Sequence, residues 1–360
     1  MVYTQEQFEK AKVLRTQYQK LGMKIGEELL YLSEQDCIDT GLTDQDIIAA
    51  TEQGMADYSR GITEMPAKIG IHPMPDSLMH AMPANLPEQY ACGIKWGSNF
   101  PSNHELFPEV VPTNCQIIYN DALTGLPLAI MDASWITKRR TPATALVSIK
   151  YGANLDAKTF GMIGCGIQGH NNVDMIENVL TELETIYIYA RHASSMDRLI
   201  KNEQPRVKAK IVKCDTVEEL VRKSEVIVSA VPIAHTPKPF VKKKWVRKGQ
   251  TLVCLDCHSV YEDAVYKAAD KYYMDSIAEH ELLAGYGYYP WGLPQITGET
   301  GGIAAGLCPG RESRDELVIF NNVGMATEDM MVARLVFDRA LEKGLGIKLP
   351  IWGSTKGLLK

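Results

Sequence analysis

A glycine-rich segment in the middle of the chain has the spacing of a phosphate-binding turn. The segment reads Gly164-Cys165-Gly166-Ile167-Gln168-Gly169 and follows the apolar run Thr159–Ile163, which is typical of a buried strand. It opens His170–Leu180, which has helical periodicity. A lone glycine pattern is weak evidence, but this one stands in the strand, turn and helix setting that dinucleotide binding requires. We therefore predict a dinucleotide site at this segment, called the glycine loop below.

Each glycine of the loop has its own physical task. In such a turn, Gly164 makes the tight bend, Gly166 lets the backbone approach a pyrophosphate, and Gly169 permits close packing of helix on strand. The N–H groups at the start of the helix supply partial positive charge for the pyrophosphate. We expect Gly164, Gly166, Gln168 and Gly169 to contact the cofactor.

The end of the next predicted strand bears on which dinucleotide binds. An NAD-preferring site offers a carboxylate to the ribose there, whereas this chain has Tyr189-Ala190-Arg191-His192-Ala193-Ser194-Ser195, without an acid. Arg191, helped by the hydroxyls of Ser194 and Ser195, suits a 2′-phosphate because a guanidinium pairs with phosphate oxygens through two hydrogen bonds. The sequence therefore favours NADP(H) over NAD(H), although an arginine that only covers the adenine would allow NAD equally.

Two charged residues stand in apolar surroundings. Asp256 closes the strand-like run Thr251–Leu255, at the carboxyl end where open α/β sheets bind their ligands. Lys95 lies inside the apolar run Gly93–Trp96, where burial of an ammonium is costly unless the group is paired or functional. The alternatives are a turn-capping aspartate and a lysine on an edge strand.

The pattern along the chain predicts two kinds of architecture. Residues 5–60 read as largely helical, and residues 61–137 read as short strands punctuated by proline and glycine, typical of an antiparallel sheet. From Thr159 onward, strands, loops and helices repeat with little alternation within the strands, as in a doubly wound parallel sheet. The predicted strands are Thr159–Ile163, Thr185–Tyr189, Lys210–Lys213, Val226–Ala230, Thr251–Leu255 and Glu316–Asn321, and helices are expected over 137–150 and 327–343.

Composition excludes several classes of protein. With 360 residues, 45% hydrophobic and 23% charged, the chain can bury a large core, and a net charge of -6 without a concentrated basic face argues against nucleic-acid binding. No apolar stretch is long enough to cross a membrane, so we expect a cytoplasmic protein with reduced cysteines. The eight histidines are dispersed, and no metal site is expected.

Three ordered segments resemble the ornithine cyclodeaminase/mu-crystallin family. They are Leu128–Ala143, the glycine loop and Val323–Asp329, and the resemblance spans residues 60–345. It implies an α/β fold in which a Rossmann domain is inserted into a substrate-binding and dimerisation domain. The expected boundaries are 1–140 for the substrate-binding and dimerisation domain, 141–315 for the Rossmann domain, and 316–360 for a segment returning to the first domain. The resemblance also implies a homodimer.

The resemblance assigns roles to five residues. Arg140 matches the arginine that grips the α-carboxylate of the substrate, and Lys95 matches the active-site lysine. Asp256 matches the catalytic aspartate that handles the proton of the substrate amine. Two positions depart from the pattern: Lys68 replaces a second carboxylate-binding arginine, and His80 stands where an acid holds the distal amine of ornithine.

The resemblance implies an NAD(P)(H)-dependent oxidoreductase that interconverts a small α-amino acid and its imine or keto form. One alternative is a cyclodeaminase that releases ammonia from a diamino acid such as ornithine and recycles its cofactor. The other is a non-enzymatic NADPH-binding protein like mu-crystallin. His258-Ser259-Val260, directly after Asp256 and Cys257, replaces the usual Pro-Gly-Lys-like turn of the family.

Overall fold

The computed structural model describes residues 3–74, 77–107, 109–233 and 236–351 of the chain. It divides into a first unit, Met1–Arg140 with Ala326–Lys360, and a second unit, Thr141–Met325. The return to the first unit begins at Ala326 and not at 316, because the strand at residues 318–321 pairs within the sheet of the second unit.

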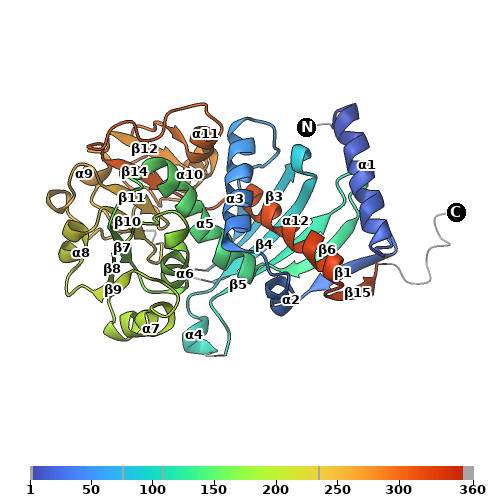
Figure 1. Cartoon of the computed structure of the whole chain (residues 1–360), viewed down its shortest axis with the longest axis horizontal. Helices are drawn as coiled ribbons and strands as arrows, with labels where there is room; N and C mark the ends of the chain where they lie inside the picture. The colour runs from blue at the N-terminus through green and yellow to red at the C-terminus, as the bar shows by residue number, and fades with distance from the viewer. Residues whose placement is uncertain (1–2, 75–76, 108, 234–235, 352–360) are drawn as a thin grey trace. The chain divides into compact units, whose positions relative to one another are not determined.

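The first unit is built on a seven-stranded sheet with the order β15-β1-β6-β5-β4-β3-β2 (Figure 1). Its strands are β1 (Glu28–Leu32), β2 (Ile69–Ile71), β3 (Leu78–Leu86), β4 (Ala91–Asn99), β5 (Thr113–Asn120), β6 (Pro127–Asp132) and β15 (Ile347–Pro350). The expected antiparallel pairing holds from β2 to β6. β1 and β6 run parallel, so the sheet is mixed. The chain between them has room for the crossover that a parallel pair requires.

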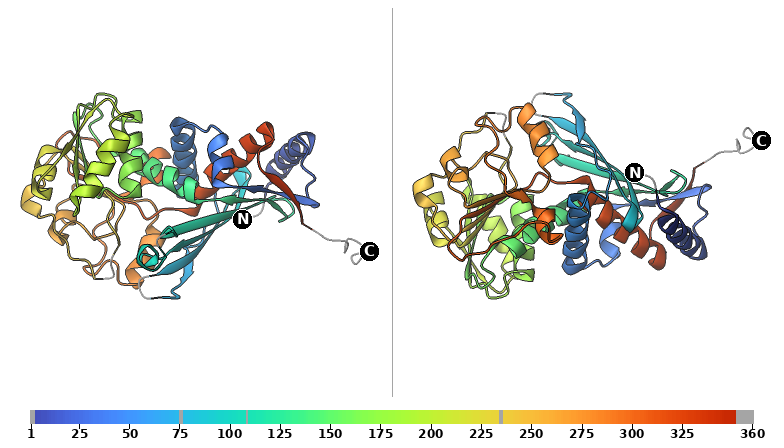
Figure 2. Two further views of the ribbon diagram at one scale, coloured as in Figure 1. Left: turned by 90° about the horizontal axis from the view of Figure 1, so that it is seen from below. Right: turned by 90° about the horizontal axis from the view of Figure 1, so that it is seen from above.

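Four helices lie on one side of this sheet (Figure 2). They are α1 (Gln5–Lys20), α2 (Glu34–Asp39), α3 (Asp44–Ser59) and α12 (Ala326–Lys343), while the short α4 (Asn103–Leu106) lies before β5. Thr4, Ser33 and Thr43 begin α1, α2 and α3 with capping boxes, in which each side chain accepts a hydrogen bond from the third residue of its helix. The helices α1, α2 and α3 agree with the helical character predicted for residues 5–60, and α12 confirms the helix expected over 327–343.

Glycines let α12 approach its neighbours closely. A Cβ on Gly54 of α3 would lie 3.0 Å from the Thr327 carbonyl oxygen and 3.0 Å from the Met331 side chain. A Cβ on Gly93 of β4 would lie 3.0 Å from the Met330 sulfur. The first two turns of α12 are therefore held firmly against α3 and the sheet.

The second unit contains an eight-stranded sheet with the order β13-β12-β14-β11-β10-β7-β8-β9. Its strands are β7 (Thr159–Ile163), β8 (Thr185–Tyr189), β9 (Lys210–Lys213), β10 (Val226–Ser229), β11 (Thr251–Cys254), β12 (Lys271–Met274), β13 (Gly298–Glu299) and β14 (Val318–Asn321). All strand pairs are parallel, and every residue of β10, β11, β12 and β14 is buried. The predicted doubly wound sheet is confirmed, with β7 and β10 flanking the point where the strand order reverses.

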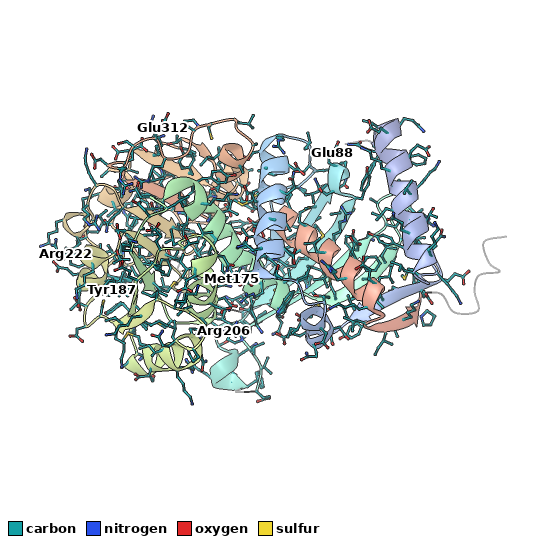
Figure 3. All side chains as sticks on the ribbon, viewed as in Figure 1. Glu88, Met175, Tyr187, Arg206, Arg222 and Glu312 are labelled. Atoms are coloured by element: carbon teal, nitrogen blue, oxygen red, sulfur yellow. The ribbon has the colours of Figure 1, made fainter. Side chains whose placement is uncertain are left out.

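Helices connect these strands and enclose the core. They are α5 (Ser134–Gly152), which begins in the first unit, α6 (Ile167–Met175), α7 (Ala193–Glu203), α8 (Val217–Lys223), α9 (Asp263–Tyr266), α10 (Ile277–Gly285) and α11 (Thr300–Ala304). Side chains fill the space around the sheet, including the fully buried Met175 and the half-buried Tyr187 (Figure 3). No helix of the described residues has the length and apolarity needed to cross a membrane.

The sequence pattern missed β12, β13, α10, α11 and β15. Lys271 begins β12, and a lysine there argues against a central strand. In the structure the Lys271 ammonium lies 2.6 Å from the Glu312 carboxylate and donates a hydrogen bond to the Gly310 carbonyl, also 2.6 Å away. This tertiary pairing makes the buried lysine acceptable, and local sequence does not reveal it.

Candidate active site

Lys95 lies on an interior strand of the first unit. β4 pairs with β3 on one side and β5 on the other, and Lys95 stands opposite Met82 and Ile117 on the face covered by helices. Only 3% of the lysine is exposed. An edge-strand explanation is therefore wrong, and the ammonium must be stabilised by partners within the protein.

Those partners come from the first turn of α12. The Lys95 Nζ lies 2.5 Å from the Asp329 Oδ2, and the Asp329 Oδ1 accepts a hydrogen bond of 2.9 Å from the Arg140 Nε. The Arg140 Nη1 donates a hydrogen bond of 3.0 Å to Glu328. All four side chains are buried. Burial and the neighbouring Arg140 charge lower the pKa of Lys95, and the Asp329 carboxylate opposes this.

The two adjacent arginines of α5 have different environments. Arg140 points into the buried cluster, whereas Arg139 pairs with Asp44 at the start of α3. Successive helical residues point about 100° apart, since an α-helix has 3.6 residues per turn. Arg140 is therefore the arginine that shares the Asp329 carboxylate with Lys95.

Lys68 and His80 lie on the same side of the sheet. His80 is opposite Gly97 on β4 and opposite Gly70 on β2, and a Cβ on Gly70 would lie 2.3 Å from the His80 ring. Burial, followed by the positive charges of Lys68, His72 and Lys95, lowers the pKa of His80 to about 4. His80 is thus neutral at pH 7, and Lys68 is 6% exposed.

Sequence reasoning assigned no role to Glu328 and Asp329. Both are completely buried, in the first turn of a helix where partial positive charge favours carboxylates. The sequence does show two adjacent acidic residues in Val323–Asp329, one of the three segments that carry the family resemblance. Their role could not be inferred from sequence, because their partners on β4 and α5 are more than 180 residues away in the chain.

In the second unit, the glycine loop has the geometry expected of it. Gly164 has a φ of +103°, and a Cβ there would lie 2.3 Å from the Ala230 carbonyl oxygen at the end of β10. A Cβ on Gly169 would lie 2.1 Å from the Gly164 carbonyl oxygen. The first and third glycines are therefore required by backbone contacts within the unit.

Gly166 differs, because a Cβ there would meet nothing within 4 Å. Gly166 is the exposed N-cap of α6 and provides no side-chain cap, and the buried Gln168 Oε1 has no hydrogen-bond partner among the described residues. An open glycine and free space at a helix N-terminus, where backbone N–H groups can donate, fit the pyrophosphate of a dinucleotide. Arg191 and Ser194 are exposed at the start of α7, just after β8. The end of β8 is tied to the loop because Gly164 N–H donates to the Tyr189 carbonyl.

Asp256 follows β11 and is completely buried. Its Oδ1 accepts a hydrogen bond of 3.0 Å from the Ser229 hydroxyl, and its Oδ2 accepts one of 3.1 Å from the Val231 N–H. Burial raises the pKa of Asp256 to about 7, although these two donors oppose the increase. A carboxyl group that titrates near neutrality suits proton transfer.

The turn after Asp256 is unusual. Cys257 has a φ of +53°, and its carbonyl oxygen accepts hydrogen bonds from Asn321 and Tyr266, both 3.3 Å long. His258 is fully buried and stacks on the Tyr266 ring at 4.0 Å, and burial lowers its pKa to about 3. Of the residues that replace the usual Pro-Gly-Lys-like turn, His258 thus belongs to an aromatic cluster and is neutral.

The structure therefore assembles two groups of predicted site residues. Lys68, His80, Lys95 and Arg140 lie together in the first unit, with Glu328 and Asp329 added. The glycine loop, the end of β10 and Asp256 form the second group in the second unit.

Comparison with known proteins finds relatives over most of the chain. The family model "Ornithine cyclodeaminase/mu-crystallin family" matches residues 31–344. An alanine dehydrogenase of Archaeoglobus fulgidus is 29% identical over 330 residues, which are 89% of this chain and 98% of that protein. A Delta(1)-pyrroline-2-carboxylate reductase of Bacillus cereus is 27% identical over 279 residues, covering 74% of this chain and 83% of that protein.

A solved archaeal alanine dehydrogenase, described as a dimer with bound NAD, superposes with a TM-score of 0.80 at 26% identity. The match covers 90% of this chain and all of that one. These relatives are enzymes, and the prediction that this chain is an enzyme is confirmed. With the family model covering most of its length, the chain belongs to the ornithine cyclodeaminase/mu-crystallin family.

Proposed function

We propose that this protein is an NAD(P)(H)-dependent oxidoreductase that interconverts a small α-amino acid and its imine or keto form. The observation that carries the proposal is the buried pair Lys95 and Arg140, which share the Asp329 carboxylate. A protein that only bound a dinucleotide would have no need for two buried cations in a separate group of residues.

Lys95 and Arg140 bind and orient the substrate carboxylate. An ammonium carries three N–H donors, so the pair with Asp329 leaves two for a substrate oxygen. The planar guanidinium restricts the orientation of the bound carboxylate, which places the adjacent α-carbon in a defined position. Lys68 adds positive charge on the same face of the sheet.

Asp256 handles the proton of the substrate amine. With a pKa of about 7, it accepts a proton when the amine is oxidised and returns the proton in the reverse reaction. Ser229 and Val231 hold the carboxyl group and fix the direction of its remaining lone pairs. Asp256, through this proton transfer, and Lys95, through its contact with the substrate carboxylate, are the catalytic residues of the proposal.

The glycine loop, with Gly164, Gly166, Gln168 and Gly169, would hold the pyrophosphate of the cofactor. A bound nicotinamide supplies or accepts the hydride at the α-carbon. Arg191 and Ser194, exposed at the start of α7, support a preference for NADP(H), because a guanidinium and a hydroxyl bind the additional phosphate of NADP(H).

The neutral state of His80 separates this proposal from a cyclodeaminase. A diamino acid has a second ammonium that requires a fixed negative charge nearby, and a histidine with a pKa of about 4 supplies none at pH 7. A small apolar amino acid is the better match to this neutral imidazole.

The deciding experiment incubates the protein with NADP⁺, NAD⁺, NADPH or NADH against amino acids, diamino acids and keto acids with ammonia or methylamine. Absorbance of reduced nicotinamide and release of ammonia are followed together. We expect absorbance changes in proportion to product. Ammonia release from a diamino acid without net absorbance change would establish the cyclodeaminase instead.

Two variants make this experiment specific. Asp256→Asn should abolish the absorbance change. Asp263→Asn removes another carboxylate, at the start of α9 and paired with Lys267, and should retain the absorbance change. Full activity in Asp256→Asn would overturn the proposed role of Asp256.

We also propose that the protein is a homodimer through the outer face of the first unit's sheet. This face has a run of apolar side chains, which continues across paired strands through Ile94, Ile118, Ile130 and Tyr31. Trp96 is 42% exposed on it. Apolar patches of this kind are typical of interfaces, and the archaeal alanine dehydrogenase is described as a dimer. Ile118→Asp should give monomers in light scattering, whereas Val13→Asp, at an exposed position of α1 on the other side of the sheet, should remain dimeric.

A cytoplasmic location agrees with the eight cysteines, all of which are free thiols. Cysteines remain reduced in that compartment. We propose this location on that ground.

A further inference from the structure

The third segment of the family resemblance ends at Asp329, and the proposed chemistry does not yet explain this residue. Asp329 is completely buried and bridges two cations, with one oxygen on Lys95 and the other on Arg140. The cations come from β4 and α5, and the carboxylate comes from α12. One side chain thus connects three separate elements.

Two cations at such short range repel each other, and burial strengthens the repulsion because the effective dielectric constant is lower than in water. Arg140 stays charged under all ordinary conditions, so Lys95 is the group that would lose its proton. Asp329 stabilises both charges. Its two carboxylate oxygens also fix how far apart the ammonium and the guanidinium stand.

We propose that Asp329 is the positioning residue of the carboxylate-binding site, which holds Lys95 and Arg140 side by side and offsets their mutual repulsion. The proposal rests on the proposed function for its substrate class, a monocarboxylate. The substrate binds to the two cations, and Asp329 acts through them.

The packing of α12 makes Asp329 suited to this task. Gly54 and Gly93 let the helix lie close to α3 and β4 around Thr327, Met330 and Met331, which flank Asp329. A carboxylate in the first turn of so closely packed a helix has little freedom to move. The N-terminal end of the helix also favours the ionised carboxylate.

Glu328 provides an internal comparison. It accepts a hydrogen bond from the Arg140 Nη1, whereas Asp329 contacts both cations. Because an arginine does not titrate in the working range of enzymes, loss of the Glu328 charge should weaken binding with a smaller effect on the protonation of Lys95. Loss of the Asp329 charge should change both.

The test measures the protonation of Lys95 directly. The full-length protein is labelled with ¹³C at the lysine ε-carbons, and the Lys95 signal is assigned with Lys95→Arg. The groups that face Lys95 are Asp329 from α12, Arg140 from α5 and Cys115 from β5, with His80 nearby on β3. In Asp329→Asn, the midpoint of the Lys95 titration should fall by about 1–3 pH units relative to the wild type.

Binding is measured on the same signal by titration with pyruvate, a small 2-oxo monocarboxylate. Asp329→Asn should bind pyruvate at least about 10-fold more weakly at pH 8, which corresponds to 1.4 kcal/mol. Glu328→Gln should weaken binding while the Lys95 midpoint falls by less than in Asp329→Asn. An unchanged midpoint in Asp329→Asn would overturn the proposal.

Two further variants cover a general loss of structure. Asp57→Asn removes another buried carboxylate of the first unit, which pairs with Arg60 and accepts hydrogen bonds from Gln53 and Gln89. A Lys95 midpoint that moved equally in Asp57→Asn would also overturn the proposal. If Asp329→Asn does not fold, Asp329→Glu decides the question. We expect the midpoint of the Lys95 titration to stay unchanged in Asp329→Glu and pyruvate to bind more weakly. Unchanged pyruvate binding in this variant would contradict the proposal.

The lysine titration does not depend on the enzymatic reaction. If no substrate turns over but the Lys95 midpoint falls in Asp329→Asn, the proposed function fails and the placement of Lys95 by Asp329 stands. If turnover is found but the Lys95 midpoint does not move in Asp329→Asn, the proposed function stands and the placement of Lys95 by Asp329 fails.

Discussion

The two units place buried ionisable groups in opposite ways. In the first unit, Lys95, Arg140, Glu328 and Asp329 are buried as ions, and each has an oppositely charged partner at 2.5–3.0 Å. In the second unit, Asp256 is buried with two neutral donors. Ion pairing opposes the loss of these charges on burial, whereas the two neutral donors of Asp256 leave burial to raise its pKa. In the proposed function, the first arrangement suits the binding of a substrate carboxylate, and the second suits the transfer of a proton.

The largest expected effect comes from the second arrangement. Asp256→Asn should lower kcat by about 10²- to 10⁴-fold, because general acid–base catalysis contributes that much. In the direction of amine oxidation, kcat/KM of the wild type should rise as the pH rises through about 7, since Asp256 must be ionised. Steady-state kinetics across pH checks both statements, and a pH limb that persists in Asp256→Asn would assign the proton to another group.

The same substitution should not destabilise the protein at alkaline pH. The raised pKa of Asp256 means that ionisation opposes folding, so the stability of the wild type declines as the pH rises from about 4 toward 7. An asparagine does not ionise, so this loss of stability does not occur in the variant. The side chain introduced by Asp256→Asn keeps both hydrogen bonds when its oxygen accepts from the Val231 N–H and its NH₂ group donates to the Ser229 hydroxyl oxygen. Urea unfolding at pH 8 should show Asp256→Asn to be at least as stable as the wild type.

Removal of the Arg140 charge from the first unit should, in contrast, destabilise the protein. Arg140→Met leaves Asp329 and Glu328 buried without one of their cationic partners, and breaking a buried pair costs about 3–5 kcal/mol. Urea unfolding should show this loss. Arg139→Met, which removes a partly exposed arginine paired with Asp44, is the matched control and should cost less. Equal losses would remove the contrast between the two arrangements.

The glycine loop allows a finer comparison within one motif. Gly169→Ala places a Cβ 2.1 Å from the Gly164 carbonyl and should destabilise the protein by about 1–3 kcal/mol. Gly166→Ala meets no atom within 4 Å and should cost less than about 1 kcal/mol, yet it should weaken dinucleotide binding. Thermal unfolding and calorimetric titration with NADPH separate the two effects. Unchanged NADPH affinity in Gly166→Ala would place the pyrophosphate elsewhere.

The smallest effect is expected at the exposed Arg191. Arg191→Ala should lower the preference for NADPH over NADH by about 10-fold, since a hydrogen bond to a charged group contributes about 1.5 kcal/mol or more. Affinity for NADH should change little. Arg198→Ala, on the helix α7 that follows Arg191, is the control. Equal loss of NADH and NADPH affinity would show that Arg191 covers the adenine and does not bind the phosphate.

Much of the second unit could be predicted from sequence because its signals are local. Parallel strands buried on both faces appear as apolar runs, and the glycine loop is one contiguous segment with a backbone requirement at each glycine. Strand β12 was missed because its first residue, Lys271, is made acceptable by Glu312 and Gly310, whose approach is a matter of tertiary structure.

The sequence by itself determined the doubly wound sheet, the dinucleotide turn, and the residue types available for carboxylate binding and proton transfer. Only the tertiary structure decided that Asp329 holds Arg140 and Lys95 together. It also decided that Asp256 is surrounded by neutral groups. The reason is physical: charge compensation and desolvation depend on distances across the fold, which bring Arg140 to Asp329 across 189 positions of the chain and Ser229 to Asp256 across 27.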